Sequence, residues 1–208
     1  MIKAIIFDIG GVLQLGKYSS QPVRGHRLLG VHNYVTGKLK ISLDQYFDAL
    51  DTAYAKSIDG TISEKQANKT IAKNLGISVK KLKQLFNQAF EQNFHPNNEL
   101  INLALKLKKQ GYKIAILSDQ WYLSKNALVT GKIKKNFKPS VISCDVGLRK
   151  PNPKIYKLIL KKLKLPAKQT VFIDNQEWNT KPAEKLGMNT ILFKKNKQVF
   201  KQLEKMLK

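Results

Sequence analysis

The first thirteen residues, MIKAIIFDIGGVL, constrain the fold of this chain more than any other stretch. Residues 4–7 form an apolar run that is too short for a buried helix and that stops at Asp8 and two glycines. Such a run is typical of a strand buried on both faces of a parallel sheet. Asp8 would then lie at the strand's carboxyl end, where open α/β sheets bind ligands. A buried acid needs a partner or a metal, so its placement indicates chemistry, with a simple turn cap as the alternative.

From Pro96 onward, strand patterns alternate with helical ones. Strands that alternate with helices favour a doubly wound parallel sheet with right-handed crossovers, which is an α/β fold. One helix is expected between the second and third strands, and a terminal helix at 200–207. The expected strands after the first are residues 113–117, 141–143, 170–173 and 190–193.

The stretch between the first strand and Pro96 has helical patterns throughout its second half. Ser42, Ser63 and Ser78 each precede such a pattern and are expected to be N-caps. We therefore predict an α/β core made of residues 1–16 and 95–208, with a small all-helical domain inserted at 17–94.

Four polar residues lie at or near the ends of the expected strands: Asp8, Ser118, Lys150 and Asp174. The carboxyl ends of parallel strands meet along one edge, so these side chains should converge there. Asp8 could be a carboxylate nucleophile that forms an aspartyl-phosphate, and Asp174 could help to hold Mg²⁺. Ser118 could donate a hydrogen bond to a phosphoryl oxygen. Lys150 could neutralise both Asp8 and the transferring phosphoryl group.

The motifs around these residues resemble those of the haloacid dehalogenase-like (HAD) hydrolase superfamily over essentially the whole chain. The matching segments are FDIGGVL at 7–13, ILSD at 116–119, GLRKPNP at 147–153 and FIDN at 172–175. The resemblance implies a Rossmann-like core whose helical cap, at 17–94, closes over the site and selects the substrate. It also implies a hydrolase with Mg²⁺ as cofactor and a small phosphorylated substrate, in which Asp8 and Lys150 are catalytic.

The same resemblance assigns binding roles to further positions. It implies that Mg²⁺ is held by Asp8, the carbonyl of Gly10 and Asp174 or Asn175. It implies substrate binding by Gly10, Gly11, Ser118, Asp119 and Lys150.

Three positions depart from the family pattern. Family phosphatases usually have an Asp two residues after the nucleophile, where this chain has Gly10. That Asp acts as a general acid, a contribution typically worth about 10²–10⁴ in rate. Asn175 replaces the second carboxylate of the acidic motif, which should weaken Mg²⁺ binding. Asp119 stands where relatives often have Asn and adds negative charge near the phosphate site.

Three functions therefore remain open. The expected one is a Mg²⁺-dependent phosphatase that favours good leaving groups, or that takes a proton from the cap or from water. The second is another chemistry of the superfamily. Dehalogenases have a different nucleophile motif from Gly10-Gly11-Val12, and phosphonate cleavage needs a Schiff-base lysine, for which Lys38 and Lys40 are available. The third is a binding protein that keeps the HAD fold without turnover, as the loss of two acidic positions suggests.

Composition limits the partners. The chain has 38 Lys and Arg against 14 Asp and Glu, a net charge of +24. The lysines follow helical patterns along the whole chain and form no basic tail, which indicates a solvated surface. We expect no specific nucleic-acid partner, although non-specific, salt-sensitive binding would follow from this charge.

The remaining signals concern location and metals. Cys144 is the only cysteine, which excludes an internal disulfide and fits a reducing compartment. No apolar run reaches membrane-spanning length and no signal-peptide pattern is present, so we expect a cytoplasmic protein without a membrane partner. His26, His32 and His95 have no acid or cysteine at ligand spacing, so they are not expected to bind a metal. The sequence specifies neither the substrate nor the oligomeric state.

Overall fold

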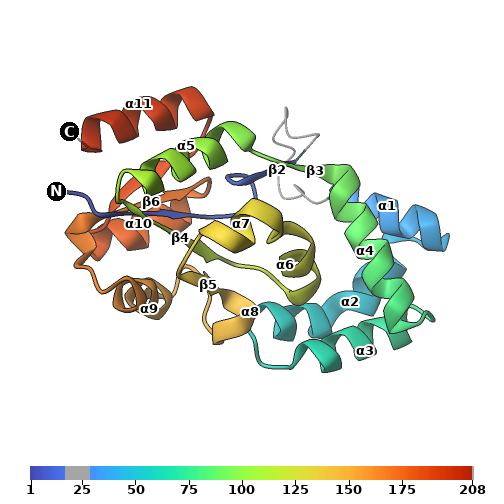
Figure 1. Cartoon of the computed structure of the whole chain (residues 1–208). Coiled ribbons are helices and arrows are strands. Elements are labelled where there is room, and N and C mark those ends of the chain that lie inside the picture. The colour runs from blue at the N-terminus through green and yellow to red at the C-terminus, as the bar shows by residue number, and fades with distance from the viewer. Residues whose placement is uncertain (17–28, 208) are drawn as a thin grey trace.

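A sheet of five parallel strands forms the centre of the computed structural model, which describes residues 1–16 and 29–207 (Figure 1). The strand order is β5-β4-β1-β6-β7, so β1 lies in the middle between β4 and β6. This confirms the doubly wound α/β fold expected from the sequence. The strands are β1 (Ala4–Phe7), β4 (Lys113–Ser118), β5 (Ser140–Ile142), β6 (Thr170–Asp174) and β7 (Asn189–Leu192).

Strand β1 is buried on both faces, as its continuous apolar sequence predicts. Ala4 and Ile6 pack into the core on one side of the sheet, whereas Ile5 and Phe7 pack into the core on the other. None of the four has measurable solvent exposure. The alternation follows from the two-residue period of a strand and fixes which way Asp8 leaves the sheet.

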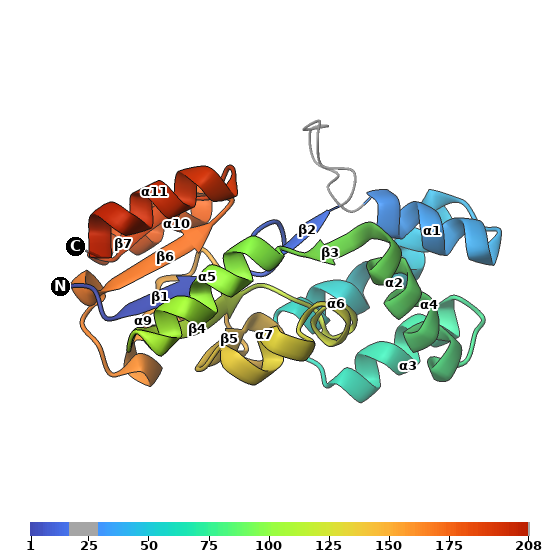
Figure 2. The same cartoon turned by 45° about the horizontal axis from the view of Figure 1, so that its top comes forward.

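Helices cover both faces of the sheet (Figure 2). The face of Ile5 and Phe7 is covered by α5 (Asn98–Lys109) and α11 (Asn196–Leu207), whose apolar residues belong to the same core cluster. The opposite face is covered by α9 (Pro153–Leu163) and α10 (Glu177–Lys185). The shorter elements are α6 (Tyr122–Leu128), α7 (Gly131–Asn136), α8 (Ser143–Val146) and the 3₁₀ helix η1 (Ala167–Gln169).

Some element boundaries differ from the sequence expectation. The one helix expected after β4 is two short helices, α6 and α7, which meet at Thr130-Gly131. Ser143 begins helix α8 and does not extend strand β5. The terminal helix begins at Asn196, four residues before the expected start, and packs Val199 into the core.

Between the first strand and Pro96, the described residues contain four helices, which form a helical unit at one end of the sheet (Figure 1). They are α1 (Leu29–Leu39), α2 (Leu43–Ile58), α3 (Glu64–Asn74) and α4 (Val79–Asn93). The three expected N-caps are confirmed: Ser42, Ser63 and Ser78 each accept a hydrogen bond from the backbone three residues on. Residues 17–28 of the predicted insert lie outside the described residues.

A short antiparallel ribbon joins the helical unit to the core. Strand β2 (Gln14–Gly16) leads out of the core and β3 (Phe94–Pro96) leads back, with Leu15 opposite His95. The sequence did not predict this ribbon, because three residues per strand are too few for a recognisable pattern. It holds the exit and return of the chain side by side.

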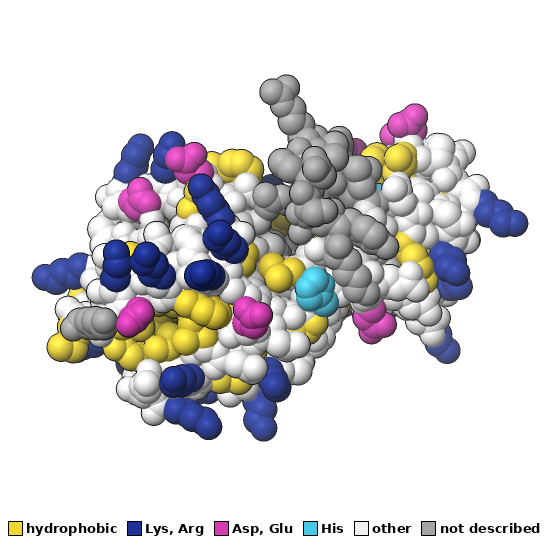
Figure 3. All heavy atoms as spheres, turned by 90° about the horizontal axis from the view of Figure 1, so that it is seen from above, with side chains coloured by type: hydrophobic (Ala, Val, Ile, Leu, Met, Phe, Trp, Pro, Cys, Tyr) yellow, Lys and Arg dark blue, Asp and Glu magenta, His cyan; other side chains and the backbone are white. Residues whose placement is uncertain are grey.

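Lysine side chains are spread over the surface. On the face that carries α5 and α11, basic side chains lie at many separate points with acidic ones among them (Figure 3). Within the described part of the chain, no helix combines the length and the apolar character needed to cross a bilayer.

Candidate active site

Lys150 bridges two carboxylates at the carboxyl edge of the sheet. Its Nζ lies 3.1 Å from Asp8 Oδ1 and 2.6 Å from Asp174 Oδ2. Asp8 follows β1 and Asp174 ends β6, and these strands are hydrogen-bonded neighbours with Phe7 opposite Ile173. The parallel register therefore brings together three of the residues that the sequence pointed to, and all three are buried.

Burial and charge shift the acidity of this cluster. Burial raises the pKa of Asp8 to about 6, and the negative charge of Asp174 adds to the rise. The positive charge of Lys150 and hydrogen bonds from Ser118 and the Ile9 backbone act against it. Burial alone would lower the pKa of Lys150, but the two carboxylates outweigh it and hold that pKa above its ordinary value. Lys150 is thus a permanent cation beside a carboxylate that ionises near neutral pH.

Asp174 has both carboxylate oxygens occupied by protein donors. Oδ1 accepts hydrogen bonds from the backbone of Gln176 at 2.8 Å and from Asn179 Nδ2 at 3.2 Å. Oδ2 accepts from Lys150 at 2.6 Å and from Asn179 Nδ2 at 3.1 Å. These bonds fix Asp174 as the anchor of Lys150.

Ser118 ends β4 beside this cluster and is fully buried. Its Oγ accepts a hydrogen bond from Gln120 Nε2 at 3.1 Å. Gln120 is fixed in turn by Ser143, whose Oγ accepts from the Gln120 N–H at 3.0 Å and donates to the Gln120 carbonyl at 3.1 Å. Neither Gln120 nor Ser143 was predicted from the sequence as a site residue, since neither belongs to one of the four motifs.

Asp119 holds the lysine loop, which is the segment at 147–153 that carries Lys150. Its Oδ1 accepts a hydrogen bond from the backbone N–H of Lys150 at 3.1 Å, and its Oδ2 lies 3.9 Å from Arg149 Nε. Arg149 also reaches Asp59 in the helical unit, at 3.5 Å. Burial raises the pKa of Asp119, against the pull of Lys150 and Arg149. In this structure the carboxylate of Asp119 is engaged with the loop that carries Lys150.

The two glycines after Asp8 meet different surroundings. Gly11 has φ +79°, and a Cβ added there would lie 2.3 Å from Asn175 Nδ2. Asn175 therefore lies directly against the loop that follows Asp8, which only glycine permits. A Cβ added at Gly10 would meet Gln120 Nε2 at an ordinary 4.0 Å, and φ there is not in the left-handed region.

The helical unit contacts the core next to this edge. The Trp121 ring, three residues after Ser118, lies 5.2 Å from the rings of Tyr54 on α2 and Phe86 on α4. A Cβ added at Gly60, just after α2, would lie 2.9 Å from the carbonyl oxygen of Cys144. Aromatic packing and close backbone contact thus bring the helical unit against the core beside Ser118.

Other residues considered from the sequence lie in different environments. His32 Nδ1 is 2.9 Å from the hydroxyl of Tyr46, His95 is exposed, and His26 lies outside the described residues. Lys38 and Lys40 are exposed near the end of α1, with Lys38 Nζ 5.6 Å from the centre of the Tyr34 ring. Over residues 1–16 and 29–207, no group of three or more His, Cys, Asp or Glu is placed to hold a metal.

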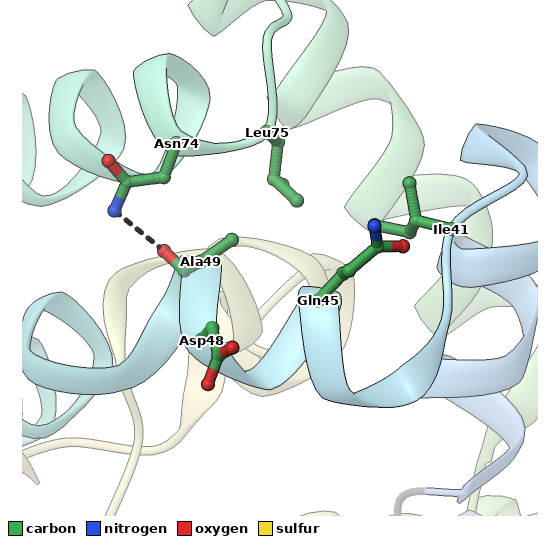
Figure 4. Close-up of a pocket in the computed structure, with 6 residues that line it drawn as sticks. All are labelled: Ile41, Gln45, Asp48, Ala49, Asn74 and Leu75. Carbon is green, nitrogen blue, oxygen red and sulfur yellow. Dashed lines mark hydrogen bonds between the residues drawn. The ribbon is translucent and has the colours of Figure 1, made fainter.

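A hollow of about 450 Å³ lies on the helical unit, between α2 and the end of α3 (Figure 4). Asn74 donates a hydrogen bond to the carbonyl of Ala49 at its rim. Asp48 is its only charged lining residue, and none of the strand-end residues borders it. It is a surface feature separate from the cluster around Lys150.

Comparison with known proteins assigns the family. The model of the haloacid dehalogenase-like hydrolases matches residues 2–187. The chain belongs to this family. This HAD hydrolase has the sequence motifs at 7–13, 116–119, 147–153 and 172–175 and, over the described residues, the expected α/β fold.

Three relatives show how far the likeness extends. Mouse bifunctional epoxide hydrolase 2 is 28% identical over 98% of this chain but only 38% of its own length, so the HAD hydrolase spans well under half of that relative. Glyceraldehyde 3-phosphate phosphatase of Methanocaldococcus jannaschii is 27% identical over 98% of this chain and 89% of its own. A HAD family enzyme of Bacteroides thetaiotaomicron is 25% identical with a TM-score of 0.71, covering 93% of this chain and 94% of that one. That enzyme has also been solved with magnesium and inorganic phosphate.

Proposed function

We propose that this HAD hydrolase is a phosphatase that passes the phosphoryl group of a small phosphorylated metabolite to Asp8 and then to water. The observation that carries the proposal is the position of the buried Lys150 ammonium. Its Nζ lies 3.1 Å from Asp8 Oδ1 and is held by Asp174 Oδ2 at 2.6 Å. A fixed cation beside the nucleophile stabilises the charge that the phosphoryl oxygens carry during transfer. The archaeal phosphatase, similar over nearly its whole length, supports this reaction class.

Each residue of the site has a separate role in this proposed reaction. Asp8 attacks phosphorus, and its raised pKa leaves it ionised above about pH 6. Lys150 and the hydroxyl of Ser118 bind the phosphoryl oxygens. The backbone of Gly10 and Gly11 forms the turn over which that group lies. Asp119 keeps Lys150 in place through the backbone contact at 3.1 Å. Water then attacks the aspartyl-phosphate, and the P–O bond to Asp8 breaks to restore the carboxylate.

The oxygen atoms of the site are suitable ligands for Mg²⁺, although few of them carry a negative charge. Asp174 has its oxygens occupied by Lys150, Asn179 and Gln176, so we propose Asp8, the Gly10 carbonyl and the Asn175 amide oxygen as the metal ligands. Mg²⁺ is commonly held by one or two carboxylates together with substrate phosphate. When bound, the metal would screen the charge between Asp8 and the phosphoryl group. The Bacteroides enzyme, which has been solved with magnesium, supports the choice of this metal.

We further propose that the helical unit is the cap that selects the substrate. Its contacts with Trp121 and with the carbonyl of Cys144 put it beside Ser118 and the lysine loop. Asp8 and Lys150 are buried, and we propose that the unit moves relative to the core when substrate enters.

The test is phosphate release from an aryl phosphate and a panel of sugar and acyl phosphates, with and without Mg²⁺. The matched control is Asp8→Asn, which keeps the size of the side chain and removes the nucleophile. We expect turnover that requires Asp8 and is increased by Mg²⁺. Turnover that persists in Asp8→Asn would contradict the aspartyl-phosphate route.

A non-catalytic binding protein is the second candidate. It is favoured by Gly10 and Asn175, which remove two carboxylates from the family pattern. This alternative predicts no turnover on any substrate and no Mg²⁺ binding by calorimetry, with or without inorganic phosphate. Mg²⁺ binding together with Asp8-dependent turnover would exclude it.

A further inference from the structure

Among the residues that the structure describes, the side of the site around Gly10 contains a hydrogen-bond donor and no proton donor. A Cβ built at Gly10 has one described heavy atom within 4 Å beyond its chain neighbours, Gln120 Nε2 at 4.0 Å. The space that a side chain at position 10 would enter is therefore bordered by the carboxamide of Gln120. A carboxamide donates hydrogen bonds but does not give up a proton at neutral pH.

Gln120 is held rigidly in this place. Its side chain is 7% exposed, and its Nε2 donates to Ser118 Oγ at 3.1 Å. Its backbone N–H and carbonyl are both bonded to the fully buried hydroxyl of Ser143, at 3.0 and 3.1 Å. One hydrogen bond to a buried hydroxyl thus holds the carboxamide, and two more hold the backbone that carries it.

The titratable groups nearby have other partners. The charged groups that act most strongly on Asp8 are Lys150 and Asp174, which bind each other at 2.6 Å. Asp119 accepts the backbone N–H of Lys150 and faces Arg149. From the helical unit, Tyr54 interacts with Asp119 and Arg149, and burial raises the pKa of its phenol. Asp59 of the same unit pairs with Arg149 at 3.5 Å. None of these groups borders the Gly10 position.

We infer that this site acts on substrates whose leaving group departs without a proton, and that acyl phosphates, in which phosphate is joined to a carboxylate, are the class that fits. The inference rests on the proposed phosphatase function and narrows its substrate. A carboxylic acid has a pKa of about 4, like a Glu side chain, so a carboxylate leaves as a stable anion. An alkoxide is a far stronger base, because its parent alcohol is about as weak an acid as water, so it needs a proton as it leaves.

The transfer balances without an acid. The Asp8 carboxylate oxygen bonds to phosphorus, the bond between phosphorus and the acyl oxygen breaks, and the electron pair leaves with the substrate carboxylate. One mixed anhydride replaces another, so no proton is taken up or released. In the second step water attacks phosphorus, the Asp8 carboxylate leaves, and the protons of the water go to phosphate and to solvent.

The experiment compares acetyl, 4-nitrophenyl, phenyl and ethyl phosphate on the full chain with Mg²⁺. We expect kcat/KM to fall steeply along this order, by at least about 10³ from acetyl to ethyl phosphate, because a missing general acid costs about 10²–10⁴. Comparable kcat/KM values, within about tenfold, would overturn the inference. No turnover of any of the four, with no phosphate on Asp8 after acetyl phosphate, would instead contradict the phosphatase proposal itself.

Gly10→Asp tests the cause of the selectivity, with Gly10→Ala as its matched control. Both substitutions put a Cβ where the structure has room, and only the first adds an acid. We expect the ratio of ethyl to acetyl phosphate kcat/KM to be about tenfold or more higher in Gly10→Asp than in Gly10→Ala. Equal ratios in the two folded variants would overturn the inference.

Two further variants check for an overlooked donor if Gly10→Asp fails to fold. Tyr54 of the helical unit interacts with Asp119 of the core. Tyr54→Phe and Asp119→Asn each remove a side-chain group that could donate a proton. We expect each to leave the ratio of ethyl to acetyl phosphate kcat/KM within about threefold of the unmodified chain, since a donor is worth about 10²–10⁴. A selective loss of ethyl phosphate turnover in either variant would identify that residue as the acid and overturn the inference.

Discussion

Lys150 is bound more closely by Asp174 than by Asp8, with Nζ···O distances of 2.6 and 3.1 Å. Asp174 is itself fully buried and fixed by Asn179 and the Gln176 backbone. The lysine is therefore positioned by one carboxylate and presented to the other. This asymmetry leaves Asp8 as the more weakly held partner, which suits a group that must form and break a bond.

Removing the lysine should destabilise the fold as well as stop turnover. Lys150→Met leaves Asp8 and Asp174 buried without their shared cation, and breaking a buried pair in this way typically costs about 3–5 kcal/mol. We expect the free energy of unfolding at pH 7.5 to fall by that amount in urea titrations. Lys157→Met, an exposed position on α9, is the control and should change it by less than about 0.5 kcal/mol. Equal stabilities for the two variants would show that the ion cluster is not maintained in solution.

The raised pKa of Asp8 should appear in the rate of the reaction. Asp8 must be ionised to attack, so kcat/KM should fall below about pH 6 with a slope of one. Raising the Mg²⁺ concentration should move this limb to lower pH, because the metal and the proton compete for the same carboxylate. A pH–rate profile at two Mg²⁺ concentrations measures both effects. A limb near pH 4 at low Mg²⁺ would mean that Asp8 is not desolvated as described.

The same pKa has an opposite consequence for stability. A carboxyl whose folded-state pKa is raised from 3.8 to about 6 stabilises the fold below about pH 4 and loses that contribution as pH rises through 6. Asp8→Asn mimics the protonated carboxyl and leaves Lys150 paired with Asp174. We expect it to match the unmodified chain near pH 4 and to exceed it by on the order of 3 kcal/mol at pH 7.5. Unfolding free energies at the two pH values check this, and a less stable Asp8→Asn at pH 7.5 would contradict it.

The two glycines that follow Asp8 should respond differently to substitution by alanine. Gly11→Ala puts a Cβ at φ +79° and 2.3 Å from Asn175 Nδ2, so it should cost about 1–3 kcal/mol and displace Asn175. Gly10→Ala meets only Gln120 at 4.0 Å and should change stability by no more than about 1 kcal/mol. Thermal unfolding of the pair provides the comparison. Similar losses for both would show that the loop geometry is wrong.

Restoring the carboxylate at position 175 should strengthen metal binding. Asn175→Asp adds a second anionic oxygen to a donor set whose only carboxylate is Asp8, and ligand charge is a main determinant of Mg²⁺ affinity. We expect the Kd for Mg²⁺ to fall at least about tenfold by calorimetry, which corresponds to about 1.4 kcal/mol. Asn179→Asp, which alters the residue that holds Asp174, is the control and should not tighten binding. An unchanged Kd in Asn175→Asp would remove Asn175 from the metal site.

The sequence predicted the parts of the fold that local patterns determine. Strand β1 is an uninterrupted apolar run, and Ser42 and Ser63 satisfy the capping pattern with Gln45 and Gln66, so these elements follow from adjacent residues. The convergence of Asp8 and Asp174 needed only the rule that parallel strand ends share an edge. The sequence did not predict the break between α6 and α7. Gly131 begins α7, but the apolar residues on both sides of it fit the pattern of one continuous helix.

The contacts that shape the site could not be predicted in the same way. Ser143 binds the backbone of Gln120 across 23 positions in sequence, and Asp119 binds the backbone of Lys150 across 31. Such pairs depend on how loops from different strands turn at the sheet edge, which residue types alone do not specify. For the same reason the sequence could not show that both oxygens of Asp174 are engaged.

Phosphorylation of Asp8 tests the central claim most directly. The chain would be mixed with Mg²⁺ and ³²P-labelled acetyl phosphate, quenched in acid within one turnover and digested for peptide mapping, with Asp8→Asn treated in parallel. We expect an acid-stable, hydroxylamine-sensitive label on the peptide that contains Asp8, and none on that peptide in the variant. Phosphate release from acetyl phosphate without any label on Asp8, or the same label in Asp8→Asn, would contradict it.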